Sequence, residues 1–322
     1  MPKKLKIDSL NADLSAISNL LKFAESANDK IGQIQYKYRK MELEEKISAL
    51  ESTPTHNASI ALYFGGKPVI GSAGISAAFA GKTIHSFQNI ISNVYASYSG
   101  DRMNDTIKGE KGKLPFLDES KLMVTTITKG SFGFILDEID NENTLTNTNL
   151  SNVVDEVANI LVDTSSNEES FFYDVVARIN SRTFSAVKEF FVTLEKNSAT
   201  LRVVEDNKDF YLNEEAIHRA KIRTEASISE EKKIELKGTL IGVLPIHRKF
   251  ELVLENNGQL IYGGMTSSAL KQYMDFEQQG ISMKENKIHA LCYQKTIESL
   301  TAEPKSVYTI YYISLEQPNL LT

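Results

Sequence analysis

Hydrophobic positions in the first fifty residues recur at helical spacing, which predicts two helices within residues 1–52. The first apolar stripe consists of Leu10, Leu14, Ile17 and Leu21. The second follows Asn28-Asp29 and consists of Ile31, Ile34, Tyr38, Met41, Ile47 and Leu50. We expect the helices to pack antiparallel within one chain and to bury both stripes. The alternative is a coiled-coil dimerisation arm, although the stripe is shorter than the roughly three to four heptads typical of such arms.

The stretch from residue 59 to 99 predicts a strand, a tight turn and a long helix. An apolar run ends in Gly65-Gly66-Lys67-Pro68, and the small residues Gly71-Ser72-Ala73-Gly74 follow. Ten of the 17 glycines lie between residues 65 and 133. We therefore expect this part of the chain to need tight turns and close backbone approaches.

Two β-rich runs, at residues 121–127 and 132–136, flank Lys129-Gly130-Ser131 and predict a hairpin. Together with the strand near Leu62 they give a largely antiparallel sheet of at least three strands. The polar segment at 100–115 predicts an exposed loop.

Helices cover this sheet and complete an α+β domain that we place at residues 1–224. Its remaining elements are two helices, a short strand and a charged helix, at residues 150–161, 187–194, 201–204 and 213–224.

Period-two alternation begins after residue 225 and predicts a second, β-rich domain at residues 225–322. Asn257-Gly258 supplies a hairpin turn, and a helical segment at 267–276 separates three strands from two more. The order strand, strand, strand, helix, strand, strand is that of a five-stranded, OB-like small β-barrel. SH3-like and other small barrels remain open, because sequence gives the order of strands and not their closure.

Composition narrows the class of protein. The chain has 322 residues, a formal net charge of −6 and a single cysteine, Cys292, which excludes an internal disulfide and a cysteine-based metal cluster. No apolar run approaches the roughly 20 residues that span a bilayer, so we expect a cytoplasmic protein without membrane contact. Residues 137–170 contain nine acidic residues and no lysine or arginine. The role of this acidic segment is left open.

Gly81-Lys82-Thr83 resembles the end of a phosphate-binding loop, with Asp137 after an apolar run as a magnesium-binding acid. The motif needs a glycine five positions earlier, where the chain has Ser76. It also needs parallel strands, whereas Asp137 ends half of a predicted hairpin. We therefore favour an ordinary helix at Gly81-Lys82-Thr83. A degenerate nucleotide-binding enzyme, with Lys82 as the phosphate ligand, is the third hypothesis for the function.

The turn after the first strand is a second candidate site. Gly65, Gly66, Lys67 and Ser72 could cradle an anion through backbone amides and the lysine side chain. The structural alternative is a tight turn packed beneath a helix. The five histidines are scattered without helical metal-site spacing, so we predict neither a metal nor a cofactor.

Tyrosines on the barrel strands are a third candidate. Tyr262, Tyr293 and Tyr308 could stack bases or contact a protein partner. Residues 225–322 hold ten basic and twelve acidic residues, so the positive charge typical of nucleic-acid binders is missing. Single-stranded nucleic-acid binding is therefore the second hypothesis for this domain.

One family resemblance adds to this reading. The run from Ala61 to Ser72, the segment Ser131-Phe132-Gly133-Phe134 and the strand Gly238-Thr239-Leu240-Ile241-Gly242 resemble an uncharacterised family of bacterial cytoplasmic proteins with a C-terminal small β-barrel. The resemblance implies no activity and transfers no catalytic residue. It implies a bacterial protein, with anti-phage defence as the expected setting.

Taken together, these patterns favour a protein that acts by binding rather than by turnover. No convergent catalytic set accompanies the two domains, and both have the potential for exposed strand edges. We expect a non-catalytic scaffold or sensor subunit whose partners are other protein subunits, in a homo-oligomer or a hetero-complex.

Overall fold

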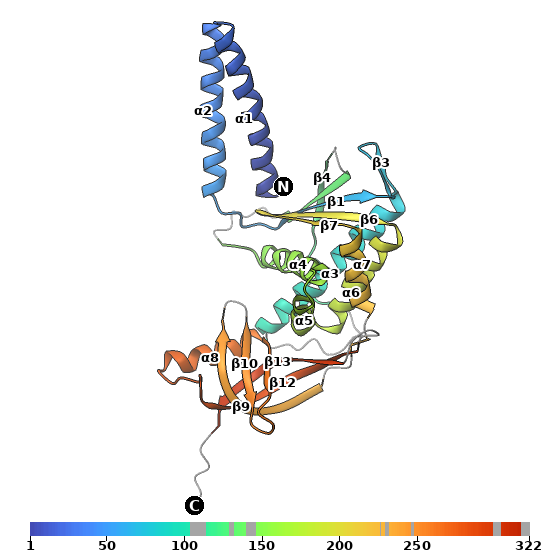
Figure 1. The fold of residues 1–322 in the computed structure, drawn as a ribbon, viewed down its shortest axis with the longest axis vertical. Helices are drawn as coiled ribbons and strands as arrows, with labels where there is room; N and C mark the ends of the chain where they lie inside the picture. Colours follow the sequence, from blue (N-terminus) through green and yellow to red (C-terminus); the bar gives the residue numbers. More distant parts are fainter. Residues whose placement is uncertain are drawn as a thin grey trace, which may run out of the picture. The chain divides into compact units, whose positions relative to one another are not determined.

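The computed structural model describes residues 1–103, 114–128, 132–139, 146–225, 227–228, 232–245, 248–298 and 304–316. Most of the predicted loop at 100–115 and the predicted hairpin connection at 129–131 lie outside these residues. The fold is α+β, with N-terminal helices, a five-stranded antiparallel sheet with helices, and a C-terminal closed five-stranded mixed β-barrel (Figure 1). The predicted fold class is confirmed.

The chain forms two compact units and passes between them several times. The first comprises Met1–Ile84, Leu117–Asn159 and Lys196–Glu214, and the second His85–Phe116, Ile160–Glu195 and Glu215–Thr322. Helices α3 (Ala77–Met103) and α4 (Asn149–Ser165) contribute residues to both units. The predicted boundary between residues 224 and 225 stays a prediction.

The first unit is built on an antiparallel sheet with β1 at its centre. The strand order is β4-β5-β1-β6-β7, and a small hairpin of β2 and β3 lies outside it. The strands are β1 (Ser59–Gly66), β2 (Val69–Ile70), β3 (Gly74–Ile75), β4 (Met123–Thr128), β5 (Phe132–Asp137), β6 (Ala199–Glu205) and β7 (Lys208–Leu212). The predicted hairpin of β4 and β5 and its pairing with β1 are confirmed.

Alternation along β1 gives the sheet two apolar faces. Leu62 lies opposite Phe134 of β5 and Val203 of β6 on one face, which is buried. On the same side, the ring of Phe64 meets Phe79 of α3 edge-on at 5.4 Å. The other face carries Ala61, which packs with Leu5 near the start of α1. Both faces of the central strand are therefore covered within this unit.

A glycine at the end of β1 is required by its neighbours. Gly66 has φ +81°, and a Cβ there would lie 2.1 Å from the carbonyl oxygen of Ser198. The sharp exit from the strand leads into β2, β3 and α3, as the glycine-rich sequence predicts.

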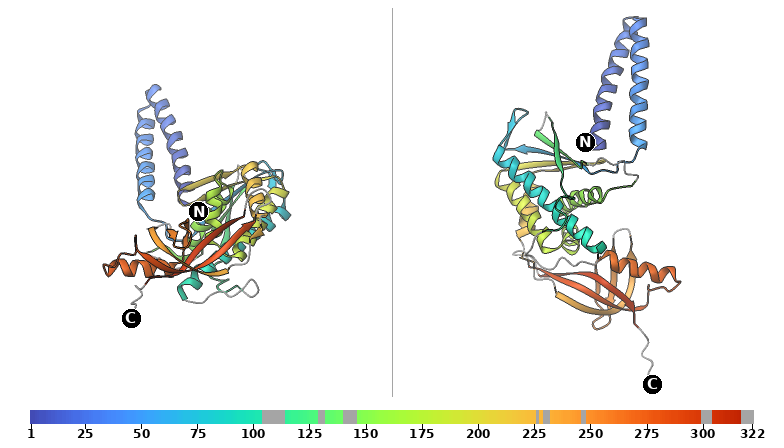
Figure 2. Two further views of the ribbon diagram at one scale, coloured as in Figure 1. Left: turned by 60° about the horizontal axis from the view of Figure 1, so that its bottom comes forward. Right: turned by 180° about the vertical axis from the view of Figure 1, so that it is seen from behind.

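The N-terminal arm is an antiparallel pair of helices, α1 (Lys3–Ser26) and α2 (Lys30–Ser52), drawn in blue in Figures 1 and 2. Asp29 caps α2 by accepting a hydrogen bond of 3.0 Å from the amide of Gly32. The face of α2 that packs on α1 includes Gly32 and Leu43, the two buried residues of the helix. The predicted antiparallel pairing is correct, but the predicted burial of the whole second stripe is wrong for four of its six residues, Ile31, Ile34, Tyr38 and Met41.

The second unit contains the barrel and the helices α5 (Glu169–Arg178), α6 (Ser181–Lys196, except its last residue) and α7 (Glu214–Glu225, except its first residue). The barrel strands are β9 (Lys232–Leu244), β10 (Lys249–Leu254), β11 (Leu260–Met265), β12 (Lys287–Glu298) and β13 (Lys305–Leu315), with a short β8 (Ser227–Ile228) paired to β12. Their order is β9-β10-β11-β13-β12, and β12 pairs again with β9.

Two features show that this barrel is OB-like, as predicted. Helix α8 (Ser267–Gln278) separates the third and fourth strands, and β11 pairs with β13 in parallel. The inward side chains form one buried core that includes Leu240, Phe250 and Ile310. Gly263 lies at the parallel pair, where a Cβ would approach the carbonyl oxygen of Tyr308 to 2.1 Å.

Candidate protein-interaction site

Four apolar side chains of α2 form an exposed row, which we call the α2 seam: Ile31, Ile34, Tyr38 and Met41. Their exposed fractions are 71%, 71%, 73% and 59%. The residues are three, four and three positions apart, which is the a/d spacing of a coiled-coil heptad. At about 100° per residue, this row lies opposite the face that contains Gly32 and Leu43. The seam therefore faces away from α1.

Charged residues beside the α2 seam are paired within the arm. Lys37 lies 3.9 Å from Glu25 of α1, and Lys40 lies 3.7 Å from Glu44. Glu42 accepts hydrogen bonds from Lys46 and Arg39, and these bonds lower the pKa of its carboxyl. The flanks of the seam are thus charged and exposed to water, and among the described residues no element covers the apolar row between them.

The base of the arm is fixed to the sheet of its own unit. The Lys3 ammonium donates to the carbonyl oxygens of Glu51 and Thr53, which links the start of α1 to the end of α2. The amide of Lys4 donates to the carbonyl oxygen of Asp206 in the β6–β7 turn at 2.9 Å. A helix pair that is fixed at one end presents its outer apolar side in an ordered form, which lowers the entropic cost of binding a partner.

The edge strand β4 is a second exposed apolar surface in this unit. Met123, Val124 and Ile127 are 52%, 45% and 56% exposed, and the order of the five strands places β4 at one edge. An apolar edge strand can pair with another chain. Its pairing with β5 is interrupted by an irregularity between Val124 and Thr126, which makes the edge less regular as a template than a flat strand.

The predicted anion cradle forms a turn whose amides are largely used. The Lys67 amide donates to the carbonyl oxygen of Ser198, and the Ser76 amide donates to that of Pro68. Gly65 and Gly66 end β1, where a Cβ on either would lie within 2.6 Å of a neighbouring atom. The side chains of Lys67 and Ser72 are exposed. Ligand binding by these residues stays a prediction.

Lys82 lies inside α3 rather than in a loop. The helix begins at Ala77, so Gly81, Lys82 and Thr83 fall in its second turn. The Lys82 side chain is exposed and that of Thr83 is buried. Asp137 ends β5, which is antiparallel to β1. The structure therefore brings these residues together in neither the loop nor the parallel sheet that a phosphate-binding site uses.

The three predicted barrel tyrosines do not share one surface environment. Tyr262 on β11 is 53% exposed, whereas Tyr308 packs partly against the barrel core. Tyr293 stacks on Tyr311 with ring centroids 4.4 Å apart, and the Lys233 ammonium lies over both rings. Only Tyr262 offers a largely open ring, and base stacking by the three tyrosines stays a prediction.

Helix α5 covers part of the outer face of the barrel beside Tyr262. The Lys295 ammonium, buried on β12, donates to the carbonyl oxygens of Val176 and Ile179 at the C-terminal end of α5. Thr309 of β13 donates to the carbonyl oxygen of Ala177 at 2.7 Å. The Lys305 ammonium lies 3.7 Å from the ring centre of Tyr173 on α5. These outward positions are therefore engaged within the chain.

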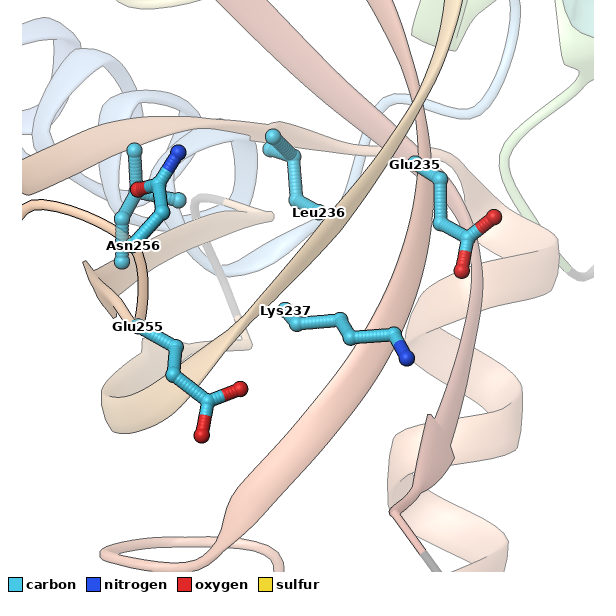
Figure 3. Close-up of a pocket in the computed structure, with 6 residues that line it drawn as sticks. Glu235, Leu236, Lys237, Glu255 and Asn256 are labelled. Carbon is cyan, nitrogen blue, oxygen red and sulfur yellow. The ribbon is translucent and has the colours of Figure 1, made fainter.

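An open groove of about 460 Å³ lies between β9 and the end of β10 (Figure 3). Leu236 and Leu254 form its apolar part and pack against the barrel core. Its charged side chains are already paired: Glu235 with His289, Lys237 with Glu316, and Glu255 with Lys287. The charged side chains of the groove therefore contact other residues of the same unit.

A buried carboxyl lies in the first unit, at the end of β6. Glu205 is 7% exposed, and burial together with the neighbouring Asp155 of α4 raises its pKa to about 8. Lys208 of β7 pairs with Asp155 and partly offsets this effect. Burial and the neighbouring carboxylate thus both favour the protonated form of Glu205, and in that form its hydroxyl can donate a hydrogen bond to Asp155. Sequence reasoning missed this group, because the partners lie on separate elements.

Comparisons with protein-family models, curated proteins and solved structures find no match to this chain. Of the resemblance to a bacterial family, the structure supports one feature, the C-terminal five-stranded barrel. Among the described residues, no helix has the length and hydropathy needed to cross a bilayer. The same residues contain no cluster of three or more His, Cys, Asp or Glu side chains arranged to hold a metal ion.

Proposed function

We propose that this protein is a non-catalytic binding subunit of a protein assembly and that the α2 seam is its principal contact surface. The observation that carries the proposal is the exposure of the four seam residues, each between 59% and 73%, on the side of α2 opposite its intrachain partner. A helix in water gains stability from covering such a row, and a second helix with matching spacing is the element that covers it best.

The size of the surface supports this assignment. The four side chains together present on the order of 500 Å² of apolar area, near the upper end of what monomeric proteins leave exposed in one patch. Single exposed hydrophobic residues need no explanation, but a regular row of four does. The setting in a bacterial assembly, with anti-phage defence as the candidate, rests on the sequence resemblance alone.

A photo-crosslinking amino acid at the seam tests the proposal. Replacement of Tyr38 by p-benzoylphenylalanine changes the exposed aromatic side chain little, and Tyr211 on β7, which is 66% exposed, is the matched control. We expect irradiation of cells of the source organism to give a defined adduct from position 38 and none from position 211. Addition of Ile34→Glu should abolish the adduct.

Equal adducts from both positions, or none from position 38, would contradict the proposed function. In the first case the surface would be generally adhesive, and in the second it would be uncovered in the cell.

A further inference from the structure

The spacing of the α2 seam is self-complementary. We propose that its occupant is a second copy of this chain, packed antiparallel through α2; this inference rests on the proposed function and names the partner. When two copies of α2 are related by a two-fold axis at the level of residue 36, positions whose numbers add to 72 lie opposite each other. Ile31 then meets Met41 of the second copy, and Ile34 meets Tyr38.

All four layers of this arrangement are apolar, and each pairs an isoleucine with a longer side chain. Antiparallel coiled coils place a positions opposite d positions, which is the pairing that these layers require. Beyond the seam the next position in the heptad is Glu45. In the two-fold register, Glu45 lies at the level of residue 27 of the second copy. That residue precedes the start of α2, so the Glu45 carboxylate stays in water.

Charges flanking the seam fit the same register. Lys30 and Glu44 occupy equivalent flanking positions two heptads apart, and the two-fold brings Lys30 of one copy near Glu44 of the other at both ends of the interface. Lys37 is the flanking residue at the centre and faces its own copy. Its ammonium already lies 3.9 Å from Glu25 of its own α1, which reduces the repulsion.

A parallel arrangement fits less well. It would place Tyr38 against Tyr38 and Met41 against Met41, so that two phenolic hydroxyls would meet in one core layer. It would also align the two helix dipoles, whereas the antiparallel arrangement opposes them. The side-chain sizes and the dipoles therefore favour the two-fold antiparallel pair.

The area places the dimer among small, transient interfaces. Two seams together bury on the order of 1,000 Å², which is at the lower limit for a specific interface. A dissociation constant in the micromolar range is therefore expected, so the dimer forms reversibly and depends on concentration.

Sedimentation equilibrium of the full-length protein across the micromolar range tests the oligomeric state. We expect a monomer–dimer equilibrium in the wild type. In Ile34→Glu the dissociation constant should rise by about tenfold or more. Phe23→Glu is the matched control, because Phe23 is also 71% exposed on the arm but lies on α1 outside the seam. It should dimerise like the wild type. A wild type that stays monomeric, or equal weakening by both variants, overturns the inference.

Charge reversal checks the register. Lys30→Glu and Glu44→Lys should each weaken the dimer about two- to fivefold through like charges at its ends, and the double variant should restore it. Failure of the double variant to restore dimerisation would rule out this register.

Single cysteines distinguish the two helix orientations. Lys37→Cys should form a disulfide-linked dimer on mild oxidation, since the two-fold brings this position close to itself. Ile31→Cys should not, whereas a parallel dimer would give the opposite result and overturn the proposal. Burial raises the pKa of the native Cys292 thiol to about 12, so it adds little background.

The outcomes separate this inference from the proposed function. A monomeric wild type that still gives a defined adduct at position 38, with a mass other than that of this chain, would end the inference and leave the proposed function standing. A monomer without any adduct would end both.

Discussion

The N-terminal arm and the C-terminal barrel treat their apolar residues in opposite ways. In the barrel, inward side chains such as Leu240 and Phe250 form one buried core, and part of the outer face is occupied by α5 of the same chain. In the arm, α2 carries two apolar faces, and only the one with Leu43 is buried. The barrel thus covers its core with its own chain, whereas α2 leaves a row of four large side chains in water.

Geometry explains the difference. A closed barrel gives every strand two neighbours, so its inward face is covered without help from outside. A pair of helices can bury one face of each helix and no more. A second apolar face on α2 can therefore be covered only by an element outside the pair, and this is why we place the binding function on the arm.

The largest expected effect tests how tightly the barrel is built. Gly263→Ala places a Cβ 2.1 Å from the carbonyl oxygen of Tyr308, at the parallel pair of β11 and β13. We expect a loss of about 3 kcal/mol or more in the free energy of unfolding. The added Cβ and the carbonyl oxygen lie on two paired strands, so neither can move away without disturbing the pairing. Thermal unfolding followed by circular dichroism measures it.

The neighbouring glycine is the control for this prediction. At Gly264 the nearest atom to an added Cβ is 3.8 Å away, so Gly264→Ala should be tolerated. Similar losses in both variants would show that the parallel pair is looser than the structure indicates.

The two faces of α2 should differ by a smaller but clear amount. Leu43→Ala opens a cavity between α1 and α2 and should cost about 2–3 kcal/mol in the free energy of unfolding. Ile34→Ala removes a side chain that is 71% exposed, so its effect on the isolated monomer should be small. Because dimerisation adds stability by mass action, the Ile34→Ala loss should grow with protein concentration and the Leu43→Ala loss should not. A concentration-independent loss in both would show that Ile34 takes no part in association.

Local patterns in the sequence predict much of the fold. Period-two alternation and the Asn257-Gly258 turn predict the barrel strands, and the helical stripe of Leu10 and Leu14 predicts α1. Short elements were harder to recognise: α5 has only ten residues, so its apolar stripe of Phe172, Val175 and Val176 is brief. The closing pair of β11 and β13 is not a local property at all.

The candidate site shows where such prediction stops. The spacing of apolar residues predicts the α2 stripe but does not separate its two faces. Ile31 and Ile47 are both apolar, and periodicity does not say which face packs. The heptad spacing of Ile31, Ile34, Tyr38 and Met41, set against the offset row of Gly32, Tyr36 and Leu43, was the signal that separates the faces.

Contacts between distant residues are likewise outside local reasoning. The Lys295 ammonium is bound by a carbonyl 116 residues away, and neither residue carries a motif.

The anchoring of α5 on the barrel gives the third prediction. Lys295→Met keeps the aliphatic stem but leaves the carbonyl oxygens of Val176 and Ile179 without this buried donor, so we expect a loss of about 1–2 kcal/mol. Lys287→Met is the control: Lys287 pairs with Glu255 at the surface, and its side chain is 60% exposed. It should change the unfolding free energy by about 0.5 kcal/mol or less. Equal losses would mean that the buried donor contributes no more than a surface ion pair.

The last prediction depends on pH and concerns Glu205. Burial raises its folded-state pKa to about 8, well above the ordinary value of 4.5 for glutamate, with Asp155, Asp206 and Lys208 as its charged neighbours. Between these two pH values the folded protein holds a proton that the unfolded chain has released. The free energy of unfolding therefore falls as the pH rises through this window.

Glu205→Gln cannot ionise, and its amide can donate to Asp155 as the protonated carboxyl does. We expect the variant to unfold at a higher temperature than the wild type at pH 8.5 and at nearly the same temperature at pH 5, in thermal scans of both proteins. Glu255→Gln is the matched control: Lys287 lowers the pKa of this exposed carboxyl, so its replacement brings no stabilisation at high pH. A Glu205→Gln difference that is equal at pH 5 and pH 8.5 would show that the carboxyl is ionised in the folded protein throughout this range, because only a proton held in the folded state makes the difference grow with pH.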